Sequence, residues 1–197
     1  AWMAVRINGT NTNVSVEGTG GDVAVETVRG AIALRGGSGL ISLRSVEGSI
    51  DVRDSRGRLD LYTVNDGIRV VAASGDVTAE TVNGNIVLDR VESTNVDIGT
   101  VNGNVTYEGV IRDGGRYQFA THNGGITLHV PDDANATVNV ATFNGRFESV
   151  FPVSIPQGRR ATRFEFSLGS GSARVDVQSF NGTVRLVRPT ARPPGRE

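Results

Sequence analysis

Short stretches in which apolar and polar residues alternate recur along almost the whole chain. In GDVAV, which begins at Gly21, Val23 and Val25 lie on one side of an extended strand and Ala24 lies on the other, because successive side chains of a β-strand point to opposite faces. The pattern predicts short strands, each with one apolar side and each opened by a glycine turn. The same spacing recurs at Ile32 and Leu34, Ile41 and Leu43, Ile50 and Val52, and Leu59 and Leu61.

The strands belong to an internal repeat whose strongest motif occurs eight times. Its copies are TVRGAIAL from Thr27, SVEGSIDV from Ser45, TVNDGIRV from Thr63, TVNGNIVL from Thr81, TVNGNVTY from Thr100, THNGGITL from Thr121, TFNGRFES from Thr142 and SFNGTVRL from Ser179. Successive copies are 18, 18, 18, 19, 21, 21 and 37 residues apart. A weaker motif lies nine residues before the first copies, so each repeat holds two strands. The last gap spans nearly two repeats, one of them degenerate.

One repeat cannot bury its apolar row alone, whereas repeats stacked about 4.8 Å apart bury all the rows in one narrow core. We therefore predict an all-β fold, a single-domain right-handed β-solenoid (a parallel β-helix) with coils of about 18–21 residues, since parallel crossovers are nearly always right-handed. About nine coils give a length of roughly 40 Å. Residues 18 apart then face each other, which pairs Glu26 with Arg44, Arg29 with Glu47 and Asp51 with Arg69, but also Arg35 with Arg53.

The ends of the chain depart from the repeat. Residues 1–18 contain the only Trp and are expected to form an N-terminal cap, residues 19–187 the solenoid, and residues 188–197 a flexible tail or linker. Aromatic residues, scarce elsewhere, gather in residues 146–173. They either plug the far end of the core or form a partner surface, for which the candidates are Phe151, Phe164 and Phe166.

The charge pattern bears on partners. The net charge is −1, which argues against nucleic-acid binding, and no run is apolar enough for a transmembrane helix. Residues 1–145 carry a net charge of −6 and residues 146–197 carry +5. Because solenoid ends expose unpaired strand edges, this split favours end-to-end self-association. The chain has no Cys, which excludes disulfides and thiol chemistry.

The most regular polar feature is a column of asparagines before the turn glycines, beside a Thr/Ser column. Asparagine side chains in stacked turns hydrogen-bond one another and the turn backbone, so we interpret the column as a structural ladder. The alternative is a flat polar surface that binds an ordered ligand such as a polysaccharide. The ladder residues are Asn65, Asn83, Asn102, Asn123, Asn144 and Asn181.

Nothing in the sequence resembles a catalytic centre. His122 and His129 lack partners at ligand spacing, and Asp132 and Asp133 lie in a turn after Pro131. A calcium roll shares the 18-residue coil but needs an aspartate pattern that Gly20-Gly21-Asp22 does not continue. Most turns are too short to wall the carboxylate-lined groove of a polysaccharide-cleaving β-helix. We expect no catalytic residue, cofactor or metal.

The iterated T-V-N-G-x-[IV]-x-[LV] resembles a bacterial putative-adhesin family of unknown function. Its C-terminal pattern is matched by Phe147, by Phe151-Pro152-Val153, by the run from Leu168 to Val175 and by the run from Ser179 to Val184. The resemblance covers about residues 14–187. It implies a β-solenoid of a secreted or envelope-attached protein and brings no catalytic residues.

These observations lead to a functional expectation. The chain is expected to be a non-enzymatic, extracytoplasmic, adhesin-like surface or scaffold module. Its partner would be a protein, a cell-surface polysaccharide or another copy of itself, without insertion into a membrane. Two alternatives stay open: a polysaccharide-active β-helix enzyme, and a sensory or regulatory domain of the cell envelope.

Overall fold

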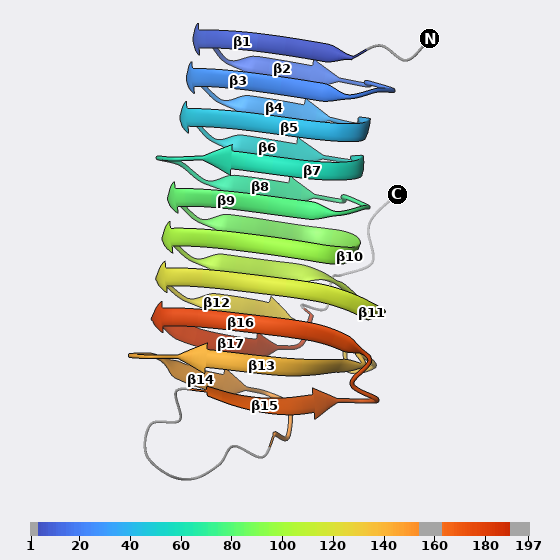
Figure 1. Cartoon of the computed structure of the whole chain (residues 1–197), viewed down its shortest axis with the longest axis vertical. Coiled ribbons are helices and arrows are strands. Elements are labelled where there is room, and N and C mark those ends of the chain that lie inside the picture. Colours follow the sequence, from blue (N-terminus) through green and yellow to red (C-terminus); the bar gives the residue numbers. More distant parts are fainter. Residues whose placement is uncertain (1–3, 154–162, 190–197) are drawn as a thin grey trace, which may run out of the picture.

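A computed structural model of the chain describes residues 4–153 and 163–189. These residues form strands and turns without a helix, and accordingly none of them forms a helix that could cross a membrane. The strands stack as a β-solenoid with two parallel ladders, one on each side of the core (Figure 1). The all-β solenoid predicted from the repeat is therefore confirmed.

Each coil contributes one strand to each ladder. In spatial order, the first ladder contains β1 (Val5–Asn11), β3 (Val23–Arg29), β5 (Ser38–Glu47), β7 (Arg56–Thr63), β9 (Val77–Asn83), β10 (Ile86–Asn102), β11 (Val105–Asn123), β16 (Ala173–Asn181), β13 (Ala136–Thr142) and the antiparallel β15 (Arg163–Leu168). The second ladder contains β2 (Val14–Glu17), β4 (Ile32–Arg35), β6 (Ile50–Arg53), β8 (Ile68–Val71), the N-terminal parts of β10 and β11, β12 (Ile126–His129), β17 (Thr183–Val187) and β14 (Arg146–Ser149).

The register agrees with the 18-residue period. Glu26 faces Arg44, Arg29 faces Glu47 with Nε 2.7 Å from Oε2, and Asp51 faces Arg69. The like-charged pair Arg35 and Arg53 also forms as the register requires. Each of these arginines forms an ion pair with a separate carboxylate, which offsets the repulsion between them: Arg35 Nε lies 3.6 Å from Asp54, and Arg53 Nε lies 2.6 Å from Asp51.

The regular stack begins earlier than expected. Strands β1 and β2 lie within residues 1–18, the stretch assigned to a cap, yet they pair with β3 and β4 in the 18-residue register. Residues 5–17 therefore form the first coil. Of the expected tail, residues 190–197 lie outside the described residues.

The order of coils changes at the C-terminal end. Seven coils follow in chain order from β1 to β12, but the next coil in space is β16–β17, which pairs with β11 and β12. The coil β13–β14, earlier in the sequence, pairs with the far side of β16 and β17 (Figure 1). The sequence suggested consecutive stacking with one degenerate coil. The structure instead inserts the last coil between two earlier ones, and its degenerate segment becomes β15, which runs antiparallel to β13.

The core is a narrow stack of fully buried aliphatic side chains between the ladders. Val25, Ile41 and Ile86 are fully buried. Where residues 112–115 lengthen a coil, Tyr107 and Tyr117 fill the widened corner, with ring centroids 6.1 Å apart. The Tyr117 hydroxyl donates to Ser93 O at 2.6 Å and accepts from Arg112 N at 2.8 Å.

Aromatic residues close the C-terminal end of the core. Phe147 and Phe164 meet edge to face with centroids 4.8 Å apart, and Phe164 is only 8% exposed. Phe151 and Phe166 are partly buried against the same cluster, with the Arg188 guanidinium over the Phe151 ring. Of the three candidates for a partner surface, Phe164 is therefore committed to the core, and the other two contribute part of their surface to it.

The glycines of the repeat allow the turns to stack. At Gly103, an added Cβ would overlap the carbonyl oxygen of Gly84 in the turn below, and at Gly124 it would overlap that of Gly103. A larger residue would push adjacent coils apart. The period of the coils therefore depends on these close backbone approaches.

Candidate binding face

One edge of the first ladder carries a continuous row of outward-facing side chains, apolar except for His122, which we call the ridge. Val64 and Val82 are half-buried and the other members are exposed. Each comes from the second position of the T-V-N-G motif, where the preceding Thr or Ser points into the core and the next residue therefore points outward. Val101 is 42% exposed, Phe180 is 40% exposed and Phe143 is 59% exposed. In spatial order the ridge consists of Val28, Val46, Val64, Val82, Val101, His122, Phe180 and Phe143.

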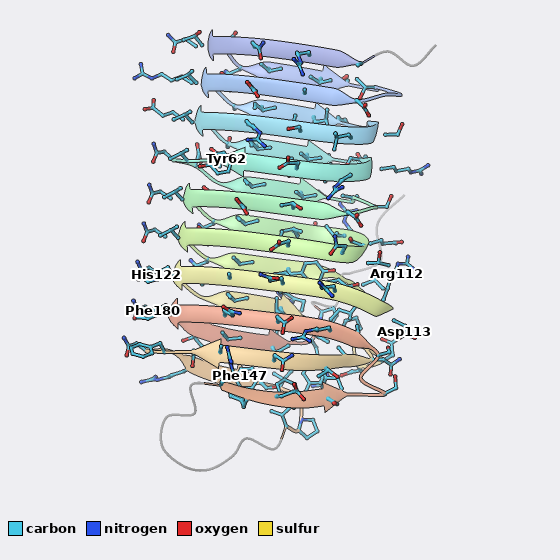
Figure 2. The ribbon with its side chains drawn as sticks, viewed as in Figure 1. Tyr62, Arg112, Asp113, His122, Phe147 and Phe180 are labelled. Carbon is cyan, nitrogen blue, oxygen red and sulfur yellow. The ribbon has the colours of Figure 1, made fainter. Side chains whose placement is uncertain are left out.

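The C-terminal end of the ridge is an aromatic stack. The Phe180 ring lies between those of His122 and Phe143, with centroids 4.7 Å apart and planes 9° apart on both sides. Figure 2 shows His122 and Phe180 one above the other at the edge of the ladder. Because β16 is inserted between β11 and β13, Phe180 separates two rings that the chain order alone would place side by side.

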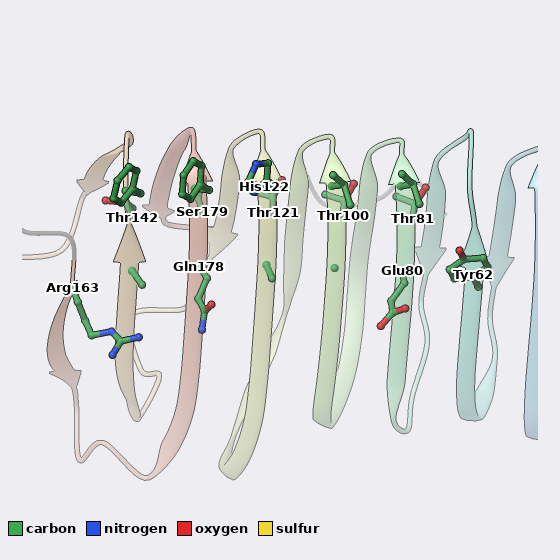
Figure 3. Close-up of a pocket in the computed structure, with 17 residues that line it drawn as sticks. Tyr62, Glu80, Thr81, Thr100, Thr121, His122, Thr142, Arg163, Gln178 and Ser179 are labelled. Atoms are coloured by element: carbon green, nitrogen blue, oxygen red, sulfur yellow. The ribbon is translucent and has the colours of Figure 1, made fainter.

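A groove of about 910 Å³ runs beside the ridge across β7 to β15 (Figure 3). Its floor is shallow because Gly99, Ala120 and Ala141 occupy outward positions where neighbouring strands carry larger side chains. Glu80 on β9 lies toward one end of the groove, and Arg163 on β15 lies at the other. The groove therefore combines an apolar wall, a flat floor and opposite charges near its two ends.

The hydroxyls of Thr81, Thr100, Thr121 and Ser179, which line the groove, are already engaged. Thr100 and Thr121 are 6% and 5% exposed, and each donates at 3.0 Å to a carbonyl of the turn in the preceding coil, that of Gly84 and that of Gly103. Ser179 donates in the same way to Gly124 O at 3.1 Å. These side chains thus hold successive turns together, and their hydroxyls are not free to bind a ligand.

The asparagine ladder runs along the other side of the ridge. Asn83 donates to Asn65 at 3.0 Å, Asn102 to Asn83 at 2.8 Å, and Asn123 to Asn102 at 2.8 Å. The series continues as Asn181 donates to Asn123 at 2.9 Å and Asn144 to Asn181 at 3.1 Å. All six predicted ladder residues therefore lie in one hydrogen-bonded row. Five of the six residues are exposed and Asn181 is half-buried, and their role in stability stays a prediction.

The other polar candidates lie apart from one another. His122 belongs to the aromatic stack, whereas His129 Nδ1 lies 3.3 Å from Arg188 O on the second ladder. Asp132 pairs with Arg188 at 2.8 Å. Among the described residues, no group of three or more His, Cys, Asp or Glu side chains is placed to hold a metal ion.

Sequence reasoning missed the ridge and the groove. The ridge was visible as the recurring Val, His or Phe at the second motif position, directly after the inward Thr. The groove was harder to predict from the sequence. Gly99, Ala120 and Ala141 are small residues far apart in the chain, and only the strand register places them side by side.

The family model of the Toastrack DUF4097 domain matches residues 79–187, which is more than half of the chain. The chain belongs to the Toastrack DUF4097 family. The function of Toastrack DUF4097 domains is unknown, and the match spans β9 to β17, including the inserted coil, the aromatic stack and most of the groove. Searches of the curated proteins and of the solved structures found no match.

Proposed function

We propose that this Toastrack chain is a non-enzymatic, extracytoplasmic, adhesin-like scaffold module that binds a protein or a cell-surface polysaccharide through the ridge and the groove. The observation that carries the proposal is the ridge of outward-facing, mostly exposed and apolar side chains beside a shallow groove on a ladder of hydrogen-bonded strands. Contiguous exposed apolar surface on a soluble domain marks interaction sites. The ladder fixes the spacing of these side chains, so little conformational entropy is lost on binding.

The chemistry of the groove supports binding rather than catalysis. The hydroxyls of Thr100, Thr121 and Ser179 are buried and donate to turn carbonyls. Glu80 is the one carboxylate among the described residues that line it, whereas glycoside hydrolysis generally uses two. The first alternative, a polysaccharide-active enzyme, would need a second acid that this lining does not provide. The second alternative, a sensory or regulatory domain of the envelope, would bind its partner through the same face and would transmit that binding as a signal.

The test has two parts. The chain with its native flanking sequence is produced in its own host, and the cells are fractionated; recovery in the cytoplasm would refute the extracytoplasmic role. Purified protein is then cosedimented with the insoluble envelope fraction. The wild type should sediment with it, and the double variant Phe143→Ser/Phe180→Ser should stay in solution.

A matched control uses Leu40→Ser. Leu40 is 48% exposed on β5, at the opposite end of that strand from Val46 of the ridge. It removes a similar apolar surface outside the ridge and groove. Equal sedimentation of the wild type and both variants would contradict the proposed binding face.

A further inference from the structure

The outward residues along the floor of the groove form a row whose two ends carry opposite charges. The register of β9, β10, β11, β16, β13 and β15 places side by side Glu80, Gly99, Ala120, Gln178, Ala141 and Arg163. Figure 3 shows Glu80 and Arg163 toward opposite ends of this row, with Gln178 between them. The row is acidic at its first strand, small and neutral in the middle, and basic at its last strand.

When two copies of this row lie against each other in antiparallel orientation, the acidic end of each meets the basic end of the other. A two-fold axis parallel to the strands, placed between β11 and β16, turns a second copy end over end and sets each Glu80 opposite Arg163 of the other copy. A two-fold interface is isologous, so each such contact occurs twice. We propose that the ridge-and-groove face binds a second copy of this chain in this antiparallel orientation. This inference rests on the proposed function and names the partner of the same face.

The neighbouring rows agree with this placement. On the ridge, the axis brings His122 of each copy level with Phe180 of the other, and Val101 level with Phe143. In the row beyond the groove, the register aligns Asp97, Gln118, Asp176 and Asn139 on successive strands. The axis therefore sets Asp97 opposite Asn139 and Gln118 opposite Asp176, so each carboxylate faces an amide. Asn139 already donates to Asp176 of its own copy at 3.1 Å, and the second N–H of its amide is the one directed to Asp97.

The two nearest alternative placements of the axis, on β11 and on β16, are less favourable. With the axis on β11, Asp97 would face Asp176, and with the axis on β16, Asp176 would face itself. Like charges placed together across an interface cost free energy. Arg116 and Arg174 lie one row farther from the ridge and would approach each other, but Arg174 Nε is 2.8 Å from Asp176. The contact therefore covers the three rows nearest the ridge.

The size of the face sets the expected affinity. Six strands about 4.8 Å apart and five residues along each strand, at about 3.3 Å per residue, give a footprint of roughly 500 Å² per copy. Stable interfaces bury about 800 Å² per partner. The dimer should therefore be reversible, with a dissociation constant in the micromolar range.

The experiment is sedimentation equilibrium of the chain from about 1 µM to about 1 mM. The wild type should fit a monomer–dimer equilibrium. Glu80→Arg and Arg163→Glu each place two like-charged pairs in the interface and should raise the dissociation constant roughly tenfold. The double variant Glu80→Arg/Arg163→Glu restores opposite charges and should recover the wild-type value. Glu108→Arg, on the second ladder, is the matched control and should leave it unchanged. Circular dichroism confirms that each variant is folded.

Each outcome decides the inference. A wild type that stays monomeric over the whole range overturns it. A dimer that is insensitive to both single charge reversals, or a double variant that is weaker than both single ones, also overturns it. Open-ended oligomers would indicate contacts between solenoid ends. If dimerisation fails but Phe143→Ser/Phe180→Ser still abolishes binding to the envelope fraction, the proposed function stands and the second copy is not its partner.

Discussion

The side-chain amide of Asn181 donates a hydrogen bond to Asn123, 58 positions earlier in the chain, at 2.9 Å. Asn144 lies between these two residues in sequence, yet it takes the last place in the row and donates to Asn181 at 3.1 Å. The ladder is therefore continuous in space although the chain does not follow it in order. The Asn–Asn contact is the same at each of these levels, so it does not depend on whether the two coils are consecutive in the chain.

Replacing one asparagine in the middle of the ladder should lower stability. Asn102→Ala removes one hydrogen bond to Asn83 and one from Asn123, and we expect a loss of about 1 kcal/mol in the free energy of unfolding. Urea denaturation measures this change. Asn8→Ala, an exposed asparagine of the first coil outside the ladder, is the control. Unchanged stability together with lost binding of a polysaccharide would support the ligand-binding interpretation of the column.

A destabilising substitution in the inserted coil should increase hydrogen exchange in the coil beyond it, β13–β14, but not in the N-terminal coils. Leu186 on β17 is fully buried, so Leu186→Ala should cost about 2–5 kcal/mol. Because β13 and β14 pair only with β15, β16 and β17, their amides should lose protection from hydrogen exchange while β3 to β9 keep theirs.

Leu34→Ala provides the matched comparison near the other end. Leu34 on β4 is 2% exposed, and its loss should release β1 and β2 instead. Hydrogen exchange read by mass spectrometry distinguishes the two patterns. Uniform loss of protection in both variants would show that the solenoid unfolds as one unit.

The buried tyrosines should make the fold sensitive to alkali. Burial raises the pKa of Tyr107 and of Tyr117 above the ordinary value. Below pH of about 10 both tyrosines are neutral in the folded and unfolded chain, and the stability is fully present. Above that pH the unfolded chain releases protons that the folded chain retains, so stability falls by up to about 1.4 kcal/mol per pH unit for each tyrosine.

Tyr107→Phe tests this account at modest structural cost, since the Tyr107 hydroxyl donates a single long hydrogen bond of 3.2 Å to Val110 O. Denaturation curves between pH 8 and pH 11 should show a shallower decline for the variant than for the wild type. Parallel curves would assign the alkaline loss to other groups.

Polysaccharide turnover should be absent. Incubation with a panel of neutral and acidic polysaccharides should release no new reducing ends and no unsaturated products, because the groove lacks a pair of acids. Glu80→Gln should behave as the wild type in this assay. A reproducible activity that one carboxylate substitution abolishes would establish the enzyme alternative.

The sequence predicts the regular part of the molecule well because alternation and period are local properties. Val23, Ile41 and Leu59 are 18 residues apart and share one buried row, as the spacing predicts. The same equivalence of repeats hides the inserted coil, since nothing in Ser179-Phe180-Asn181-Gly182 states which coil lies next to it.

The binding face was hidden for a related reason. A valine at an alternating position predicts a strand but does not by itself reveal that its neighbours above and below are also exposed and apolar. The groove depends on adjacency across strands that are 18–58 residues apart in sequence, such as Tyr62 with Glu80 and Ala120 with Gln178. Long-range adjacency of this kind is set by the fold and not by a local motif.

The inserted coil also constrains how the molecule is made. A ribosome delivers β13 and β14 before it delivers β16 and β17, the strands on which they finally rest. The nascent chain can stack its coils in order only as far as β12. The next coil to emerge, β13–β14, cannot yet form its final pairs because β16 and β17 have not been synthesised. Completion of the solenoid therefore waits until residue 187 has left the exit tunnel. A chain stalled before residue 173 leaves the edges of β11 and β12 unpaired, and the C-terminal strands of another nascent chain have the pairing pattern that fits those edges.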